Sequence, residues 1–380
     1  MPHEFGVNVH FVEPDEQEVK MIQEGGFSVV RTDLFWDQVE RVKGTYDFSE
    51  YDKFVNAMSK YKIKVLFILD YGNPYYDNGN APYTDEGRDA FARFAQTSVR
   101  HFASRDIIWE IWNEPNSDDF WPPKQNNDDY CKLALNVVKS IKSIDSEAKI
   151  IAPAVSGIEW DFLTSLGKYQ LVEQLDGISV HPYRSEPPES VFTDYSKLRL
   201  MLDQFSPNKK TPIITGEWGY STTYIKTDEK QAQYITRLYL TDILCGVPMS
   251  IWYDWRDDGQ DKNNSEYNFG VIRHNKVPKT AYYAVKTLTR TLMGYTFIKQ
   301  IPLKSQDDYA LLFENGTKAV LAVWTTQRSH SVKLKIKEKS ASLISITGSK
   351  TSLKAGKNGF EVQLSQSPNY LLFSKGSLVE

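Results

Sequence analysis

The feature that most constrains the fold is an unbroken alternation of strand-like and helix-like segments from the N-terminus to about residue 292. The predicted strands are short apolar runs at Phe5–Phe11, Val29–Leu34, Ile63–Asp70, Ile107–Asn113, Lys149–Ala154, Gly177–His181, Pro212–Glu217 and Ser250–Tyr253. Helical patterns lie between them, at Glu16–Glu24, Tyr51–Tyr61, Asp85–Phe102, Asp129–Ile144, Tyr195–Phe205, Glu229–Leu244 and Thr280–Thr289. Short strands separated by helices are typical of a parallel sheet with right-handed crossovers. Eight such units within residues 1–292 predict an α/β fold, the (β/α)₈ TIM barrel.

A doubly wound open sheet is the competing architecture. It would usually carry a glycine-rich phosphate loop after an early strand, and this sequence has none. The closed barrel is therefore the favoured prediction.

The sequence pattern changes after Tyr295. Short, partly alternating apolar runs follow one another, separated by turn residues, at Phe297–Ile301, Tyr309–Phe313, Ala319–Trp324, Val332–Ile336, Leu343–Ile346, Phe360–Leu364 and Tyr370–Phe373. Runs of this kind predict a small antiparallel β-sandwich. We therefore divide the chain into a barrel, residues 1–292, and an accessory β-sandwich domain, residues 293–380, which we expect to pack on the barrel.

Composition excludes several classes of partner. The net charge of −4 comes from interleaved acidic and basic residues, whereas a nucleic-acid-binding protein needs a concentrated basic face. No apolar run approaches the ~20 residues that cross a bilayer.

Cys131 and Cys245 make no disulfide framework. The first residues lack the pattern of a signal peptide, so we expect a cytoplasmic protein unless a signal was trimmed, in which case it is secreted or periplasmic. Oligomeric state is not indicated.

Polar side chains collect at the predicted strand ends, where the loops of a TIM barrel build its mouth. They are Asn8, His10, Arg31, Asp33, Asp70, Asn73, Asn113, Glu114, His181, Tyr183, Glu217 and Asp254, with Trp36 and Trp252 beside them. Glu114 and Glu217 end two buried strands, in the runs Trp109–Asn116 and Pro212–Gly219. Two such carboxylates are what glycoside hydrolysis needs, one as proton donor and one as nucleophile or base.

Other chemistries have weaker support. His10, His181 and Asp33 could bind a metal, but no spacing signature favours this. A serine-hydrolase site would need a Gly-x-Ser-x-Gly elbow, which is absent. Glu110 lies deeper in its strand than Glu114, and we interpret it as a structural carboxylate paired inside the barrel. We predict neither a metal nor an organic cofactor.

The chain resembles the retaining glycoside hydrolases of clan A, and most of all glycoside hydrolase family 39 with its bacterial exopolysaccharide-hydrolase branch. The resemblance lies in short segments that span nearly the whole barrel in the expected order: Val30–Trp36, Leu69–Pro74, Trp109–Asn116, Ser179–Tyr183, Thr215–Gly219 and Trp252–Arg256. The Asn-Glu-Pro corner at residues 113–115 is the most specific of them.

The resemblance implies a role for each matched residue. Glu114 would be the acid/base, Glu217 the nucleophile, and Asn113 a ligand of the sugar 2-hydroxyl. Arg31 would keep Glu217 ionised, since a neighbouring cation stabilises the charged form. Tyr183 or His181 would orient the same carboxylate, and Trp252 would form the floor of the −1 subsite. The remaining candidates for substrate binding are Trp36, Asn73, Asp254 and Trp121.

Two long connections indicate the shape of the substrate. Ser117–Asn127 carries a stiff aromatic edge at Phe120 and Trp121, and Arg256–Lys276 is rich in Asp, Asn and Gly. Long loops in a compact domain are usually functional. Two raised walls predict a cleft and an endo-acting hydrolase of an exopolysaccharide or plant glycan. The alternatives are an exo-acting β-xylosidase or β-glucosidase, a non-catalytic carbohydrate-binding barrel, and loops that pack on a dimer partner or the β-domain.

Overall fold

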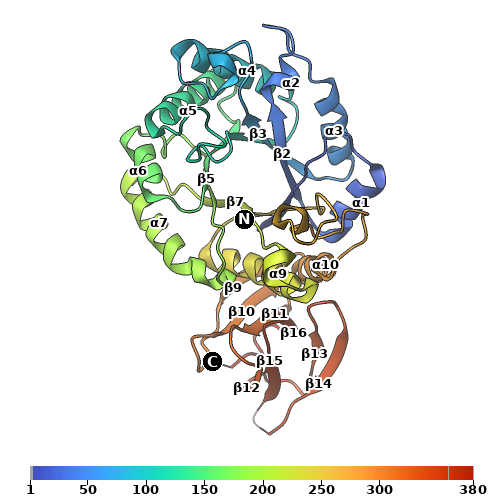
Figure 1. Ribbon diagram of the computed structural model, residues 1–380. Coiled ribbons are helices and arrows are strands. Elements are labelled where there is room, and N and C mark those ends of the chain that lie inside the picture. Colours follow the sequence, from blue (N-terminus) through green and yellow to red (C-terminus); the bar gives the residue numbers. More distant parts are fainter. Residues whose placement is uncertain (1–2, 358, 380) are drawn as a thin grey trace.

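A computed structural model describes residues 3–357 and 359–379. Eight parallel strands close into a barrel, because each pairs with the next and β8 returns to β1 (Figure 1). They are β1 (Glu4–Asn8), β2 (Val29–Phe35), β3 (Lys64–Asp70), β4 (Ile107–Ile111), β5 (Lys149–Ser156), β6 (Gly177–His181), β7 (Ile213–Trp218) and β8 (Met249–Trp252). The predicted TIM barrel is confirmed.

Helices surround the barrel as an outer ring (Figure 1). They are α1 (Glu16–Gly25), α2 (Trp36–Val39), α3 (Ser49–Lys60), α4 (Asp85–His101), α5 (Asn127–Lys142), α6 (Trp160–Lys168), α7 (Phe192–Phe205), α8 (Thr222–Ile225), α9 (Asp228–Cys245) and α10 (Thr280–Leu292). Short 3₁₀ segments are η1 (Asp77–Gly79), η2 (Pro188–Val191) and η3 (Ser265–Asn268). Among the described helices, none combines the length and apolar character that a bilayer-spanning segment needs.

Strand parity decides which side chains fill the barrel. A compact group of aliphatic residues packs inside it: Val29, Leu66, Ile68, Ile108, Ile151, Ile214, Met249 and Ile251. Successive residues of a strand point to opposite faces, so their immediate neighbours point outward against the helices. This parity determines which of the predicted site residues can reach the mouth.

The remaining strands form the C-terminal lobe, drawn below α9 in Figure 1. They are β9 (Thr296–Gln300), β10 (Asp308–Asn315), β11 (Lys318–Thr325), β12 (His330–Leu334), β13 (Ser340–Ile344), β14 (Lys350–Lys354), β15 (Phe360–Leu364) and β16 (Asn369–Ser374). Six form an antiparallel sheet in the order β14-β13-β16-β11-β10-β9, and β12 pairs with β15. A second hydrophobic core lies within this lobe, as the predicted β-sandwich requires.

The lobe packs on the barrel through a buried aromatic and ionic contact. The indole Nε1 of Trp324 donates to Oε1 of Glu189 at 2.7 Å, and Arg237 holds both oxygens of the same carboxylate at 2.7 and 2.6 Å. The ring of Tyr309 is stacked between Trp324 and Phe192, with centroids 4.7 and 6.1 Å away. The two parts therefore share one continuous core.

Candidate active site

A cavity of about 520 Å³ opens at the carboxyl ends of the strands. Its lining comes from β1, β2, β3, β5 and β7 and from the loops that follow β1, β3, β4, β6 and β8: Asn8, Val9, His10, Arg31, Thr32, Asp33, Ile68, Tyr71, Asn113, Glu114, Phe120, Ser156, Tyr183, Glu217, Tyr253, Glu266 and Phe269. The predicted pair of glutamates thus faces one cavity. One carboxylate oxygen of each lies within 4.8 Å of the other.

Glu217 is held as a charged carboxylate. Its Oε1 accepts from the Tyr183 hydroxyl at 2.7 Å, while its Oε2 accepts from Arg31 Nη1 at 2.7 Å and Asn8 Nδ2 at 3.0 Å. Burial raises the pKa of Glu217, but the charge of Arg31 and the hydrogen bonds from Tyr183 and Asn8 outweigh it and lower the pKa below the usual value. The group is therefore ionised at neutral pH.

Glu114 has a different partner. Nδ1 of His181 lies 3.0 Å from its Oε1, and Nε2 of the same ring lies 3.4 Å from Arg31 Nη2. A guanidinium can only donate, so the geometry assigns the proton of His181 to Nδ1, which donates to Glu114. This leaves Oε2 of Glu114 to face the cavity. His181 thus contacts Glu114, whereas the resemblance offered it as a partner of Glu217.

Arg31 joins these groups at the floor of the cavity. It is 1% exposed and donates from Nε to Glu110 at 2.6 Å and from Nη2 to Oδ1 of Asn113 at 2.8 Å, in addition to its contact with Glu217. Asn113 in turn donates to the Tyr71 hydroxyl at 3.1 Å. Glu110 is fully buried and pairs inside the barrel, as its position in the strand indicated.

Local backbone geometry aims both glutamates at the mouth. The residues Trp112 and Glu114 have φ of 67° and 46°, so the chain turns sharply after β4. Few non-glycine residues adopt this left-handed region, and such backbone clusters at functional sites. In β7 the pairing register with β8 shifts between Thr215 and Trp218, and an irregularity of this kind redirects the side chain of Glu217.

Six predicted substrate-binding residues do not line the cavity. His181 is fully buried and bonds Glu114 from behind, and the other five are Trp252, Trp36, Asn73, Asp254 and Trp121. Trp252 follows the inward-facing Ile251, so parity turns it outward, where its Nε1 donates to the Phe269 carbonyl at 3.2 Å. Trp36 also has outward parity, and it is buried against Tyr76 with its Nε1 bonded to Glu40.

The other three have structural partners. Asn73 is buried and bonds the Glu40 carbonyl and the Tyr75 amide. Trp121 is 1% exposed and packs on Trp112. Asp254 is 1% exposed and lies behind His10, with the closest oxygen 3.8 Å from Nδ1.

Their neighbours occupy the cavity wall. Tyr253 stands there in place of Trp252, and Phe120 in place of Trp121. Glu266 and Phe269, which belong to the long loop after β8, line the cavity together with Tyr253. Period-two alternation identifies Tyr253 from the sequence once Ile251 is known to face inward, whereas no sequence signal distinguishes Phe120 from Trp121.

Among the described residues, two groups could hold a metal ion, because each brings three ligand atoms within 4.8 Å of one another. One is Glu114, His181 and Glu217, and the other is His10, Asp254 and Asp258. The set His10, His181 and Asp33 considered from the sequence is therefore divided, since its two histidines lie in different groups.

Comparison with known proteins identifies relatives among the glycoside hydrolases. Residues 3–257 match the family model described as Cellulase (glycosyl hydrolase family 5). A β-xylosidase from Geobacillus stearothermophilus is 23% identical over 289 residues, covering 64% of this chain and 56% of that protein. A β-xylosidase from Caldicellulosiruptor saccharolyticus is 24% identical over 264 residues, covering 62% and 50%. The chain spans about half the length of these curated relatives.

A solved structure covers more of the chain. The family 39 glycoside hydrolase from Bacteroides cellulosilyticus superposes with a TM-score of 0.86 at 27% identity, over 97% of this chain and 80% of that one. The likeness therefore includes both the barrel and the C-terminal lobe. It is consistent with the resemblance to clan A and family 39 drawn from the sequence segments.

Proposed function

The chain belongs to the cellulase family (glycosyl hydrolase family 5) of the clan A glycoside hydrolases, and from this premise we propose that it is a retaining β-glycoside hydrolase acting within a polysaccharide. The observation that carries the proposal is the pair Glu114 and Glu217 in one cavity, with an oxygen of each within 4.8 Å of the other. Retaining enzymes hold their carboxyl groups ~5–5.5 Å apart, against ~6.5–9.5 Å in inverting enzymes.

In the first step Glu217 attacks the anomeric carbon as Glu114 protonates the leaving oxygen. The three hydrogen bonds to Glu217 fix its position and keep it ionised until it attacks. The bond from His181 fixes Oε1 of Glu114, so that Oε2 carries the proton toward the glycosidic oxygen. Glu217 thereby forms a covalent ester with the sugar.

In the second step Glu114 has lost its proton and acts as base toward water, which attacks the ester. Arg31 keeps one anionic partner throughout, because Glu110 remains paired with Nε after Glu217 has become neutral. The buried guanidinium is thus never left without a counter-ion, which would be costly.

The cavity favours an internal stretch of polymer over a single terminal sugar. Phe120 stands on one side and Phe269 with Glu266 on the other, and the 520 Å³ between them exceeds the space of one sugar ring. An exo-acting β-xylosidase is the second candidate, because the two curated relatives described above are named β-xylosidases.

The charges of the lining favour a neutral polymer. Arg31 is the one arginine or lysine among the described lining residues, and its donors are already bonded to Glu110, Glu217 and Asn113. His10 is the other cationic lining residue at neutral pH, and it is already bonded to Asp258, whereas Glu266 adds a carboxylate beside the two glutamates. An acidic sugar would therefore be repelled.

Product sizing tests the proposal. The wild type and Glu114→Gln are incubated with neutral β-linked plant and bacterial polysaccharides, including xylan, and the products are separated by length. We expect mid-sized oligosaccharides from the wild type alone, with the β-anomer formed first. Release of monosaccharide alone would identify the exo-acting enzyme. Binding without any release would support a carbohydrate-binding barrel, and an α-anomer formed first would contradict retention.

A further inference from the structure

The loop that joins β6 to α7 has an active-site end and a lobe end. It starts at His181 and Tyr183, which bond the two reacting carboxylates. It ends at η2 and Phe192, where Glu189 and Phe192 meet the C-terminal lobe. Only a few residues separate the two ends of the loop. A displacement at the contact with the lobe can therefore shift Tyr183 and His181 at the active site.

Internal hydrogen bonds make this loop one stiff body. Arg184 donates from Nε to the Pro182 carbonyl at 3.0 Å and from Nη1 to the Ser190 hydroxyl at 3.3 Å, so it ties the two ends together. The Ser190 hydroxyl donates to the Pro187 carbonyl at 2.8 Å. From outside the loop, Tyr220 donates to the Glu186 carbonyl at 2.7 Å.

The lobe end is anchored by a buried charge. Glu189 is 6% exposed and accepts three hydrogen bonds of 2.7 Å or less. Two come from the guanidinium of Arg237, and one comes from the indole of Trp324. A buried carboxylate must keep its donors, because leaving one unpaired is costly. Arg237 belongs to the barrel, so Trp324 is the donor that the lobe contributes.

We infer that Trp324 is a positioning residue of the active site. Through Glu189 and the stiff loop it holds Tyr183 in place to donate to Glu217. The C-terminal lobe is then part of the catalytic apparatus, although none of its described residues lines the cavity. This inference rests on the proposed role of Glu217 as nucleophile.

The variant Trp324→Phe tests it, because phenylalanine keeps a ring against Tyr309 but cannot donate to Glu189. We expect kcat to fall about tenfold, roughly the effect of one misplaced hydrogen bond, while KM changes less than about twofold. The acid limb of the kcat/KM profile should move to higher pH, because a weaker Tyr183 donor stabilises the charged form of Glu217 less.

Three comparisons separate positioning from folding. In a Tyr183→Phe background, Trp324→Phe should lower kcat no further, since residues that act through one contact are not additive. Tyr370→Phe is the matched control in the same lobe, because the buried Tyr370 hydroxyl has no hydrogen-bond partner, and it should leave kcat unchanged. Amide exchange in residues 182–190 should become faster in Trp324→Phe and not in the control.

The result that would overturn the inference is a Trp324→Phe enzyme with lower thermal stability but wild-type kcat, pH profile and amide exchange. A loss of kcat that adds in full to that of Tyr183→Phe would overturn it as well. If the wild type cleaves no substrate, the proposed function fails, and amide exchange still decides whether the lobe holds the loop.

Discussion

At the scale of single residues, Asn8 is the most informative partner of Glu217. Replacing Arg31 would leave Glu110 charged and buried without its cation, and such a loss typically costs about 3–5 kcal/mol of stability. Replacing Asn8 removes one donor to Glu217, and the Oδ1 of Asn8 has no hydrogen-bond partner to lose. A change in catalysis can then be separated from a change in folding.

We predict that Asn8→Ala lowers kcat by about 10- to 100-fold, since a hydrogen bond to a charged group contributes about 1.5–3 kcal/mol. In the pH profile of kcat/KM, the acid limb of this variant should move to higher pH, because the lost donor favoured the ionised form of Glu217. Steady-state kinetics across pH measure both effects. A variant with the wild-type profile would remove Asn8 from the positioning of Glu217.

His10 is a second residue with a measurable electrostatic role. Burial lowers its pKa, but the 2.9 Å hydrogen bond to Asp258 and the charges of Asp254, Asp258 and Asp33 raise it to about 9. The folded pKa thus exceeds the ordinary value of 6.5. The pair contributes stability that is complete below about pH 6.5 and is lost as the pH rises through about 9.

Asp258→Asn should therefore destabilise the protein at about pH 6 and have little effect at about pH 10. Since 39% of the His10 side chain is exposed, we expect a loss of only about 0.2–1 kcal/mol, as for exposed ion pairs. Urea denaturation at the two pH values measures it, and NMR titration of His10 should show a lower pKa in the variant. An equal loss at both pH values would contradict the prediction.

Sequence patterns predicted which polar residues lie together at the cavity better than which aromatic residues do. Glu114, Glu217, Asn113, Arg31, His181 and Tyr183 were candidates from the sequence, and the structure gathers them around one cavity. Trp252 and Trp36 were chosen for their residue type, but strand parity turns both outward. Parity could not be assigned from the sequence, because strands of a barrel are apolar on both faces.

At the scale of elements, the loop after β4 presents one ring to the cavity. The Phe120 carbonyl accepts from Trp112 Nε1 at 2.8 Å, and buried Trp121 anchors the next position. The Phe120 ring is stacked near Tyr71 at 6.0 Å and is 37% exposed. A fixed and partly exposed ring beside the reacting pair is suited to stacking against a sugar.

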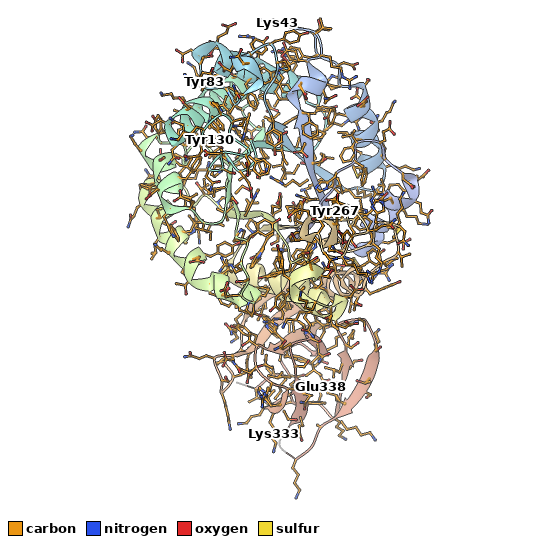
Figure 2. The ribbon with its side chains drawn as sticks, in the orientation of Figure 1. Lys43, Tyr83, Tyr130, Tyr267, Lys333 and Glu338 are labelled. Atoms are coloured by element: carbon orange, nitrogen blue, oxygen red, sulfur yellow. The ribbon has the colours of Figure 1, made fainter. Side chains whose placement is uncertain are left out.

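We expect Phe120→Ala to raise KM for long oligosaccharides about 3- to 10-fold, the contribution of one aromatic contact, with little effect on short aryl glycosides. Tyr83→Ala is the matched control. Tyr83 is 39% exposed and lies away from the cavity, toward the outer edge of the barrel in Figure 2. Equal changes in KM for short and long substrates would place Phe120 outside any additional sugar subsite.

The strands of the barrel could be predicted to within a few residues, because their apolar runs are bounded by turn residues. The helix α6 was missed, since Trp160–Lys168 is short and contains Thr, Ser and Gly. The strand β14 was missed because Lys350–Lys354 is a polar, largely exposed edge strand without an alternating pattern. Short elements and polar edge strands therefore leave the weakest trace in the sequence.

At the scale of the whole molecule, the barrel and lobe share a core that neither would bury alone. The stack of Phe192, Tyr309 and Trp324 lies between them, and Lys230 and Gln233 of α9 bond Gln366 and Ser367. Figure 2 shows Tyr267 over the barrel mouth, whereas Lys333 and Glu338 lie far away in the lobe. The lobe therefore supports the barrel from its side.

A truncation test follows from this shared core, and the predicted division at residues 292 and 293 defines the fragment. The barrel alone, residues 1–292, should expose Phe192 and lose the Trp324 bond to Glu189, so we expect its melting temperature to be roughly 10 °C lower. It should also bind a hydrophobic dye. Calorimetry of the fragment and the full chain measures the difference, and adding the separate lobe, residues 293–380, should restore part of it. A fragment with the same melting temperature and the same kcat as the full chain would contradict the prediction. It would show that the lobe neither stabilises the barrel nor positions the loop between β6 and α7.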